Sequence, residues 1–444
     1  MTILERRTVF LDTALFLFAF CFVVGAGLMI QFWIVPALFD GPSTAVGLIP
    51  GIDSFGFHMI AVHQAELIRT DGWRMWELRP GGQGPAGVAS IFYAYLPNHP
   101  AVLLPLHGVI FGIAVVCARG ILEAIIQDRA ASLIAVVPFF LFPSFVVVWG
   151  QIHKDLFTGA GFLLILLSGL AALSGSRRIT VVLLGVIVGS LLVVVMRPYA
   201  LAVIAAATLP FVLVGLKSGI GTFLRVLAVP LLVFSVLLID SRITERNTPA
   251  SGAMGASTEF VERTEETCSP TPSHSMLDRV LFQIGILRLD FQRRYPSATS
   301  NLDTSVKLRS FTDYLAYAPQ AVGIAVLRPF PSEFLQAQSA VGQVGSVLAA
   351  GEMMFAYAAF FFAFMLNFKR MRNPYLLATI AGLLIFILIY VYAIPNLGTL
   401  YRMRLFAFTL LVSLSVGLIV SALMEKRRRH NANGTEPHPP DVEG

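Results

Sequence analysis

The stretch ITVVLLGVIVGSLLVVVM, residues Ile179 to Met196, contains no charged side chain. A helix needs about 20 apolar residues to cross the hydrocarbon layer of a membrane. Stretches of similar length and character recur along the chain, so we expect about ten membrane-spanning helices. The ten expected spans are Val9–Leu38, Ala101–Ala118, Ser132–Trp149, Leu156–Leu173, Ile179–Met196, Tyr199–Leu216, Phe223–Asp240, Val347–Phe368, Tyr375–Ile394 and Leu405–Met424.

The composition of the whole chain agrees with this prediction. Hydrophobic residues make up 56% of the 444 residues and charged residues only 13%. A soluble domain has about a quarter of charged residues, so the composition excludes that class. We therefore predict an all-α polytopic membrane protein.

Lysine and arginine predict the orientation of the spans. If ten spans alternate, the basic clusters all fall on one side, which the positive-inside rule identifies as cytoplasmic. Both termini are then cytoplasmic, and the net charge of +6 needs no nucleic-acid partner. We expect the inner (cytoplasmic) membrane, an uncleaved first helix, and no disulfide among Cys21, Cys117 and Cys268. The basic clusters are Arg6/Arg7, Arg119/Arg129, Arg177/Arg178, Lys217/Arg225, Lys369/Arg370/Arg372 and Lys426 to Arg429.

Two large loops are expected outside the membrane, each with short interfacial helices. Tyr314–Leu327 is apolar but short, and a crossing there would make eleven spans and reverse the last basic clusters, so we expect it to be interfacial or re-entrant. The opening of the second loop, 248–275, is rich in Ser, Thr, Pro and Gly and predicts a flexible segment. The predicted units are 1–240 with the first external loop at 39–100, 241–346 with an interfacial segment at 314–331, 347–424, and a disordered tail at 425–444.

Charged residues recur at the external ends of the spans. Asp53 begins a stretch with helical spacing in the first loop, where a helix N-terminus favours a carboxylate. Short turns carry His153-Lys154-Asp155, Arg197-Pro198-Tyr199 and Asn396 to Arg404. Such residues can be membrane-surface anchors, but together their cations suit a phosphate and their acids suit proton transfer. This predicts sugar transfer from a lipid phosphate carrier.

The arrangement resembles the GT-C class of membrane glycosyltransferases, such as protein mannosyltransferases and lipid A aminoarabinose transferases. The phrase Asp53-Ser54-x-x-Phe57-His58-x-x-Ala61 is similar to the Asp-x-x-x-Tyr/Phe-x-x-x-Ala pattern in their first loop. Lys154-Asp155 is similar to their second acidic site, and Arg197-Pro198-Tyr199 to a recurrent Arg-x-Tyr turn. The later phrases Tyr317-x-Pro319 to Pro331 and Gly398 to Arg404 resemble related bacterial envelope proteins.

The resemblance implies a polyprenyl-phosphate sugar donor, an envelope glycan, lipid or protein acceptor, and inversion at the anomeric carbon. It makes Asp53 the candidate base and Asp155 a supporting acid. Two features depart from the family: Ser54 follows Asp53 where many mannosyltransferases have a glutamate, and we expect no large soluble C-terminal domain of the kind that oligosaccharyltransferases carry. The candidate catalytic residues are Asp53 and Asp155, and the candidate substrate-binding residues are His58, Lys154, Arg197, Tyr199, Arg402 and Arg404.

Other functions remain open at this point. An O-antigen-type polymerase or ligase using pyrophosphate-linked glycans also has external arginines and a large late loop. A lipid-linked sugar transporter or flippase is a third class, although such proteins carry ionisable residues near the membrane midplane. His58, His63 and Glu66 have loose spacing, so no metal site is predicted; a divalent metal at the first-loop acid stays open through the resemblance.

Overall fold

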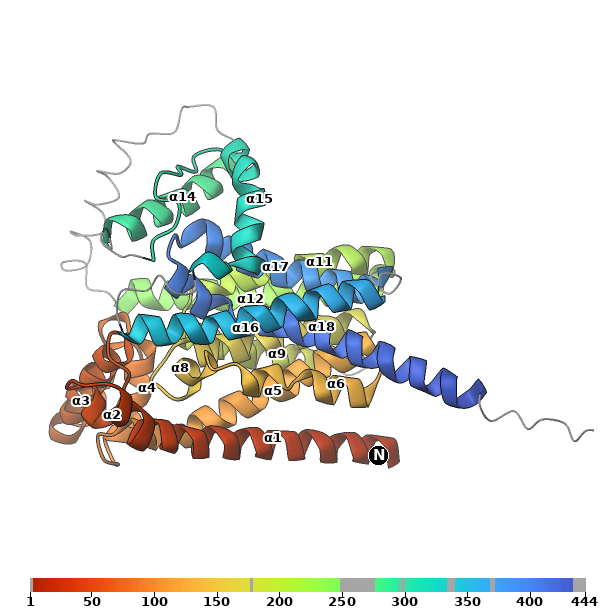
Figure 1. The fold of residues 1–444 in the computed structure, drawn as a ribbon. Coiled ribbons are helices and arrows are strands. Elements are labelled where there is room, and N and C mark those ends of the chain that lie inside the picture. The colour runs from red at the N-terminus through yellow and green to blue at the C-terminus, as the bar shows by residue number, and fades with distance from the viewer. Residues whose placement is uncertain are drawn as a thin grey trace, which may run out of the picture.

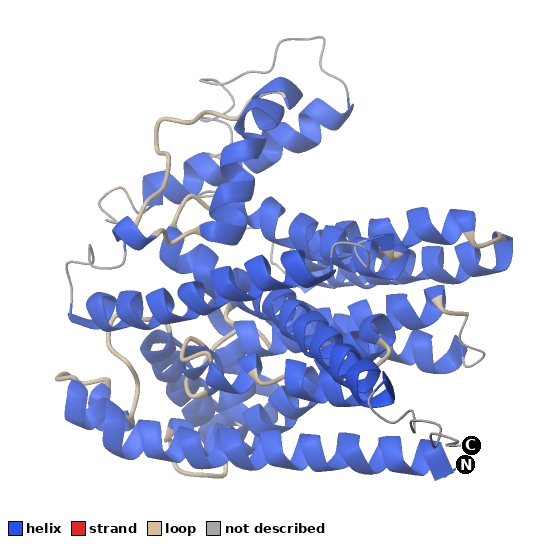
Figure 2. Ribbon diagram, turned by 45° about the vertical axis from the view of Figure 1, so that its right-hand side comes forward, coloured by secondary structure: helices blue, strands red, loops and turns tan. Residues whose placement is uncertain are grey.

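The chain is mainly helical in the part that this computed structural model describes, residues 3–175, 179–247, 276–294, 296, 300–333, 340–367 and 372–433. Within these residues Figure 2 shows helices and loops but no strand, and one isolated β-bridge joins Asn301 to Asn396. The long helices are α1 (Ile3–Met29), α5 (Leu104–Ile126), α9 (Asp155–Leu173), α10 (Ile179–Met196), α11 (Ala200–Lys217), α12 (Ile220–Asn247), α14 (Met276–Arg294), α15 (Phe311–Leu327), α16 (Ala340–Asn367), α17 (Pro374–Ala393) and α18 (Leu397–Asn433).

Nine helical segments of the described residues are long and apolar enough to cross a membrane. All nine correspond to expected spans, and the bounds of Ile179–Met196 are the expected ones. The protein is therefore an all-α, multi-pass membrane protein. The nine segments are Val9–Leu38, Pro100–Ile126, Asp155–Leu173, Ile179–Met196, Ala200–Lys217, Ile220–Thr244, Val344–Asn367, Pro374–Ala393 and Leu397–Asn431.

The expected span at 132–149 is not one continuous helix. It is divided into α6 (Arg129–Ala135), α7 (Pro138–Leu141) and α8 (Phe145–Trp149). Proline has no backbone N–H and its ring clashes with the preceding helical turn, so Pro138 starts a new short helix and Pro143 lies in the break before α8. Among the described residues, nine of the ten expected spans are thus continuous helices, and the tenth is this broken segment.

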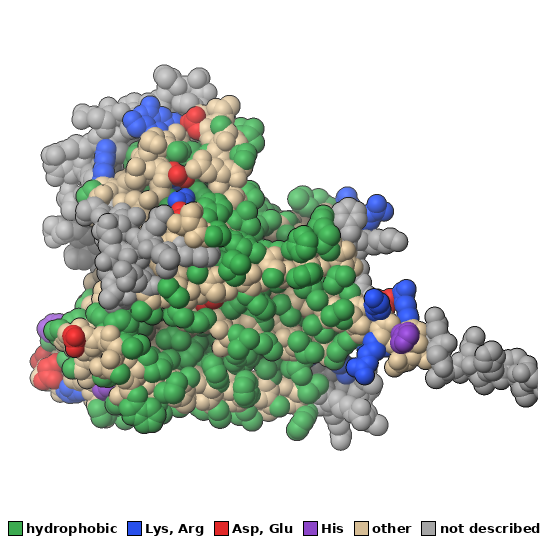
Figure 3. Space-filling model, viewed as in Figure 1, with side chains coloured by type: hydrophobic (Ala, Val, Ile, Leu, Met, Phe, Trp, Pro, Cys, Tyr) green, Lys and Arg blue, Asp and Glu red, His purple; other side chains and the backbone are tan. Residues whose placement is uncertain are grey.

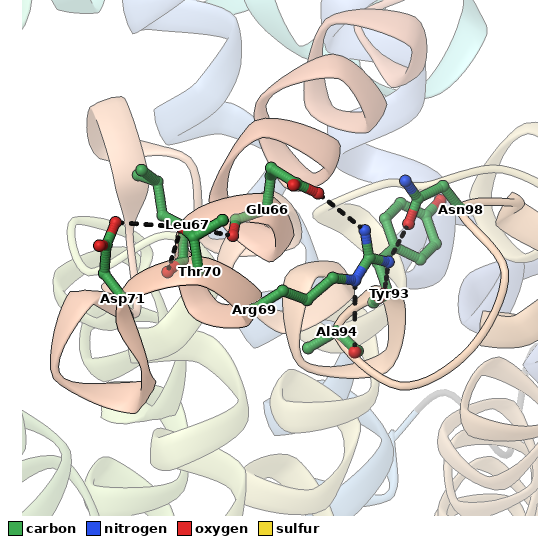
Figure 4. Close-up of polar contacts among 8 residues, drawn as sticks. All are labelled: Glu66, Leu67, Arg69, Thr70, Asp71, Tyr93, Ala94 and Asn98. Atoms are coloured by element: carbon green, nitrogen blue, oxygen red, sulfur yellow. Dashed lines mark hydrogen bonds and ion pairs between the residues drawn. The ribbon is translucent and has the colours of Figure 1, made fainter.

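The first large loop folds into a small helical unit of its own. Its elements are η2 (Thr44–Val46), α3 (Ser54–Asp71), η3 (Trp73–Met75), η4 (Pro80–Gly82) and α4 (Gly84–Tyr93). The first span ends in η1 (Ile30–Ile34) and α2 (Val35–Leu38), and the second begins with η5 (Pro100–Leu103). Figure 4 shows how Arg69 of α3 holds the end of α4: its guanidinium donates to the carbonyl of Tyr93 and to Asn98 Oδ1 at 2.8 Å. Because a helix C-terminus leaves carbonyls unpaired, this arginine fixes α4 against α3.

The second large loop contributes α14, α15 and η6 (Pro331–Glu333), and α14 and α15 both contact α17. The Leu302 backbone N–H donates to the Pro395 carbonyl at 2.8 Å, and the Leu397 N–H donates to the Ser300 carbonyl at 2.9 Å. In Figure 1, α15 lies across the direction of α16 and α17, and it is not among the nine candidate spans. The segment 248–275 lies outside the described residues.

Two boundaries differ from the expectation. α12 continues to Asn247, beyond the expected end of the span at Asp240, and Asp240 pairs with Arg79 of the first loop (Nη1 to Oδ2, 3.2 Å). α18 continues to Asn433. Residues 425–433 are therefore helical, whereas we expected them to be disordered. Charged side chains at i and i+4, such as Glu425 and Arg429, stabilise an exposed helical turn.

The bundle has two chemically different ends. One end, which we call the loop end, carries α3 and α4 together with the turns that precede α9, α11 and α18; the N-terminus lies at the other end (Figure 1). In Figure 3 a hydrophobic band separates the loop end from lysines and arginines at the opposite end. Arg119 is an exception to the expected basic clusters, because it is buried and paired with Asp12 (2.7 Å) and Glu123 (2.9 Å).

Helices α9 and α10 pack very closely, and this contact positions the site described next. A Cβ atom added at Gly161 of α9 would lie 2.5 Å from the Gly189 carbonyl oxygen, and one added at Gly189 would lie 2.8 Å from the Gly161 carbonyl oxygen. Only glycine permits such an approach of two backbones. The start of α9 consequently lies against the end of α10.

Candidate functional site

The centre of the site is a buried ion pair at the loop end. Asp155 is the first residue of α9, and Arg197 lies in the turn between α10 and α11. Arg197 Nη2 donates to Asp155 Oδ1 at 2.7 Å, and the two side chains are 9% and 5% exposed. A buried charge requires a partner, so each group stabilises the other in place.

His153 connects this pair to α18. Its Nδ1 lies 2.8 Å from Asp155 Oδ2, and its Nε2 lies 3.1 Å from Arg402 Nη1. A guanidinium has donors only, so Arg402 donates to Nε2, while Nδ1 lies within reach both of Asp155 Oδ2 and of the Asp155 backbone N–H, which is 3.3 Å away. His153 therefore lies between Arg402 and Asp155 and connects α18 to the buried pair.

Asp53 stands at the open side of the same cluster. It precedes the first residue of α3, as expected, but makes no capping hydrogen bond to that helix. Its Oδ2 lies 3.6 Å from Arg402 Nη1, and the Asp53 side chain is 64% exposed against 26% for Arg402. Since 3.6 Å is longer than a hydrogen bond, Arg402 and Asp53 form an ion pair without a direct hydrogen bond.

Lys154 and Tyr199 complete the surroundings of the pair. The Lys154 ammonium lies 5.2 Å from the centroid of the Phe57 ring, a cation–π contact with α3. Burial lowers the pKa of Lys154, and the neighbouring Arg197 guanidinium lowers it further. The Tyr199 hydroxyl lies 3.5 Å from Arg197 Nη1, and the tyrosine ring is exposed.

The turn that carries His153 is fixed by amide side chains. Gln151 Oε1 accepts from the Ile49 backbone N–H at 2.9 Å, and its Nε2 donates to the Gly47 carbonyl at 3.2 Å. Gln31 Nε2 donates to the Gly150 carbonyl at 2.8 Å. The first loop and the turn before α9 are therefore joined by a defined set of hydrogen bonds.

The charges of the cluster do not cancel. Lys154, Arg197 and Arg402 are three cations against the two carboxylates of Asp53 and Asp155, which leaves one positive charge when His153 is neutral. Arg197 and Asp155 neutralise each other inside, while Lys154, Arg402 and Asp53 are the partly exposed groups. The arrangement can hold an anion beside an accessible carboxylate.

Two of the expected site residues lie apart from this cluster. His58 is buried and its Nδ1 is 3.0 Å from the Tyr93 hydroxyl; burial lowers the pKa of its imidazole, and His99 lowers it further. Arg404 is fully buried, and its guanidinium donates to the carbonyls of Ile324 (2.8 Å), Ala325 (2.6 Å) and Arg328. Those carbonyls belong to the end of α15, so Arg404 holds that helix and is not open to a ligand.

Sequence reasoning placed His153 in the right turn but did not list it as a site residue. Its position directly before Lys154-Asp155 was the available signal. Glu352, a buried acid in α16, was also missed, although an ionisable residue in an apolar span is a functional signal in itself. Within the part of the chain that the structure describes, no group of three His, Cys, Asp or Glu side chains could hold a metal ion.

Comparison with known proteins identified no relative of this chain. No protein-family model matches the chain, no curated protein matches it, and no solved structure matches it. The function of this multi-pass membrane protein is therefore argued from the cluster at the loop end.

Proposed function

We propose that this protein is a membrane glycosyltransferase that moves a sugar from a polyprenyl-phosphate carrier to an envelope glycan, lipid or protein acceptor. The observation that supports the proposal most is the convergence of Asp53, Lys154, Asp155, Arg197 and Arg402 in one half-exposed cluster. They come from segments as far apart as the first loop and the last helix. A set of surface anchors has no reason to meet in this way.

The proposed location is the extracytoplasmic side of the cytoplasmic membrane. The loop end carries the site, and the opposite end carries exposed cations such as Lys217 and Arg428. Cytoplasmic loops hold the excess of lysine and arginine, so the N-terminus and C-terminus are assigned to the cytoplasm. A lipid carrier then presents its phosphate at the depth where the spans end.

The proposed reaction uses the two kinds of charge for different tasks. Arg402 and Lys154 bind the phosphate of the donor, and Asp53 accepts the proton of the acceptor hydroxyl. The acceptor oxygen forms a bond to the anomeric carbon while the bond from that carbon to the phosphate oxygen breaks. The extra negative charge on the departing lipid phosphate stays beside Arg402, where it is stabilised.

Binding of the carrier tests this assignment without knowledge of the sugar. Polyprenyl phosphate is titrated against the purified protein in lipid nanodiscs, and Arg402→Gln is compared with Arg74→Gln, an exposed arginine of η3 outside the cluster. Loss of one charge-assisted phosphate contact predicts affinity weaker by roughly tenfold to a hundredfold for Arg402→Gln. The Arg74→Gln control should bind as the wild type does. Equal affinities in all three proteins would remove the phosphate site from the proposal.

A further inference from the structure

Glu352 is a carboxylate buried within a membrane-spanning helix. It lies in α16, inside the candidate span Val344–Asn367, and is 3% exposed. A charge inside the membrane is costly, and such residues face the interior of the bundle and have partners. Glu352 takes no part in the cluster at the loop end, so its presence needs a separate explanation.

Three donors point at the Glu352 carboxylate. The Ser144 backbone N–H donates to Oε1 at 2.6 Å, the Ser144 hydroxyl donates to Oε2 at 2.8 Å, and the Tyr401 hydroxyl donates to Oε2 at 2.5 Å. Ser144 lies in the break between α7 and α8, immediately after Pro143. At membrane depth no water satisfies the backbone of a broken helix, and here the side chain of Glu352 does so.

A cation balances this buried acid through a shared tyrosine. The Arg404 guanidinium lies 5.1 Å from the Tyr401 ring centroid and 4.9 Å from that of Phe408, and its Nη2 lies 3.8 Å from Met353 Sδ. Tyr401 thus binds Glu352 with its hydroxyl and Arg404 with its ring. The linked groups join the break before α8 to α16, α18 and the end of α15.

Both chain segments that Glu352 binds lead directly into the site. α8 begins after Ser144 and ends at Trp149, four residues before His153, and Tyr401 is the residue before Arg402. His153 and Arg402 are the two residues that meet at 3.1 Å. We propose that Glu352 is a positioning residue: it holds the α8 segment and the start of α18 so that His153 and Arg402 meet. Its catalytic consequence rests on the proposed function, whereas the positioning itself does not.

The structural part is tested with a single-tryptophan protein. Trp149 is buried, 3% exposed, and lies between Ser144 and His153, so it reports on this segment when Trp33, Trp73 and Trp76 are replaced by Phe. Glu352→Ala should raise the acrylamide quenching constant of Trp149 about twofold or more, because the tryptophan loses its fixed packing. Glu352→Gln, which keeps one carbonyl acceptor, should restore part of the protection. Ser190→Ala, a buried hydroxyl in α10, is the matched control and should change nothing.

The catalytic part is tested by transfer kinetics on the same variants. A shift of the His153–Arg402 contact should lower kcat about tenfold or more and raise the KM for the lipid-phosphate sugar less than Arg402→Gln does, since Arg402 and Lys154 keep their charges. If Glu352→Ala does not fold, Tyr401→Phe removes one of the three donors and should show a smaller effect in the same direction.

Each outcome decides the proposal. Quenching and kcat equal to those of the parent in folded Glu352→Ala, or in Tyr401→Phe if that is the variant that folds, would overturn it. Altered quenching with unchanged kcat would make Glu352 a support of the broken helix and no positioning residue. If the wild-type protein transfers no sugar from any donor, the proposed function fails, and the Trp149 measurement alone decides whether Glu352 holds the segment.

Discussion

The buried pair of Asp155 and Arg197 predicts an unusual order of stabilities among three variants. We consider Asp155→Leu, Arg197→Met, and the two changes combined. Each single change leaves one charge without its partner in a region that is less than a tenth exposed. The double change leaves no charge in this position. The reasoning therefore predicts that the double variant is more stable than either single variant.

The magnitude follows from the geometry of the pair. At 2.7 Å the attraction amounts to about 6 kcal/mol with an effective dielectric constant of about 20. Burial of two ions costs several kcal/mol for each, so the pair as a whole contributes little to stability. Removal of one partner should cost about 3–5 kcal/mol, whereas the double change should cost about 1 kcal/mol, mainly through the lost contact of His153 with the Asp155 carboxylate.

The free energy of unfolding is measured by titration with SDS in mixed micelles, with far-UV circular dichroism as the signal. All three variants and the wild type are compared at the same lipid and detergent composition. A double variant that costs as much as the sum of the two single variants would refute the reasoning. So would a single variant that costs less than about 1 kcal/mol, since that is the value for an exposed pair.

Three further predictions concern neighbouring features. Because the pKa of Lys154 is lowered, Lys154 should lose its charge at a lower pH than an ordinary lysine, and the affinity for polyprenyl phosphate should fall as the pH rises through that range. In a pH series of binding titrations, Lys154→Arg should abolish this alkaline loss. Gly161→Ala should push α9 from α10, separate Asp155 from Arg197 and lower transfer at least about tenfold, whereas Gly221→Ala in α12, where an added Cβ contacts nothing, should retain activity. Arg404→Met should expose the end of α15 and speed its proteolysis, which mass spectrometry detects, while donor binding stays intact, unlike in an Arg402 variant. Proteolysis at the wild-type rate would contradict the capping role of Arg404.

The positions of the spans could be predicted because length and apolar character alone determine whether a helix can cross a membrane. Ile179–Met196 is the clearest case, since its bounds coincide with those of α10. The break between α6 and α8 could not be predicted from composition, because a broken and an unbroken segment bury the same apolar residues. Pro138 and Pro143 were the signal in the sequence. Whether they break the helix depends on a partner for the freed backbone groups, and that partner is Glu352, 208 residues from Ser144.

The same distinction applies to the candidate site. The order of the charged turns and their common membrane side predicted that Asp155, Arg197 and Arg402 would gather, and the structure brings these three together. The sequence could not distinguish Arg402 from Arg404, two residues later on the same helix. That distinction depends on which face of α18 meets α15, a tertiary contact that leaves one arginine partly exposed and the other fully buried.

The measurement that tests the central claim most directly is sugar transfer by wild-type protein and Asp53→Asn in lipid, with a panel of polyprenyl-phosphate sugars as donors. Asparagine keeps the size of the side chain and removes its ability to accept the proton. The account predicts that the variant still binds the donor, because Lys154 and Arg402 are intact, and that its transfer falls at least a hundredfold. Full transfer by Asp53→Asn would contradict the role of Asp53 as the base. Absence of transfer by the wild type with every donor would contradict the proposed function itself.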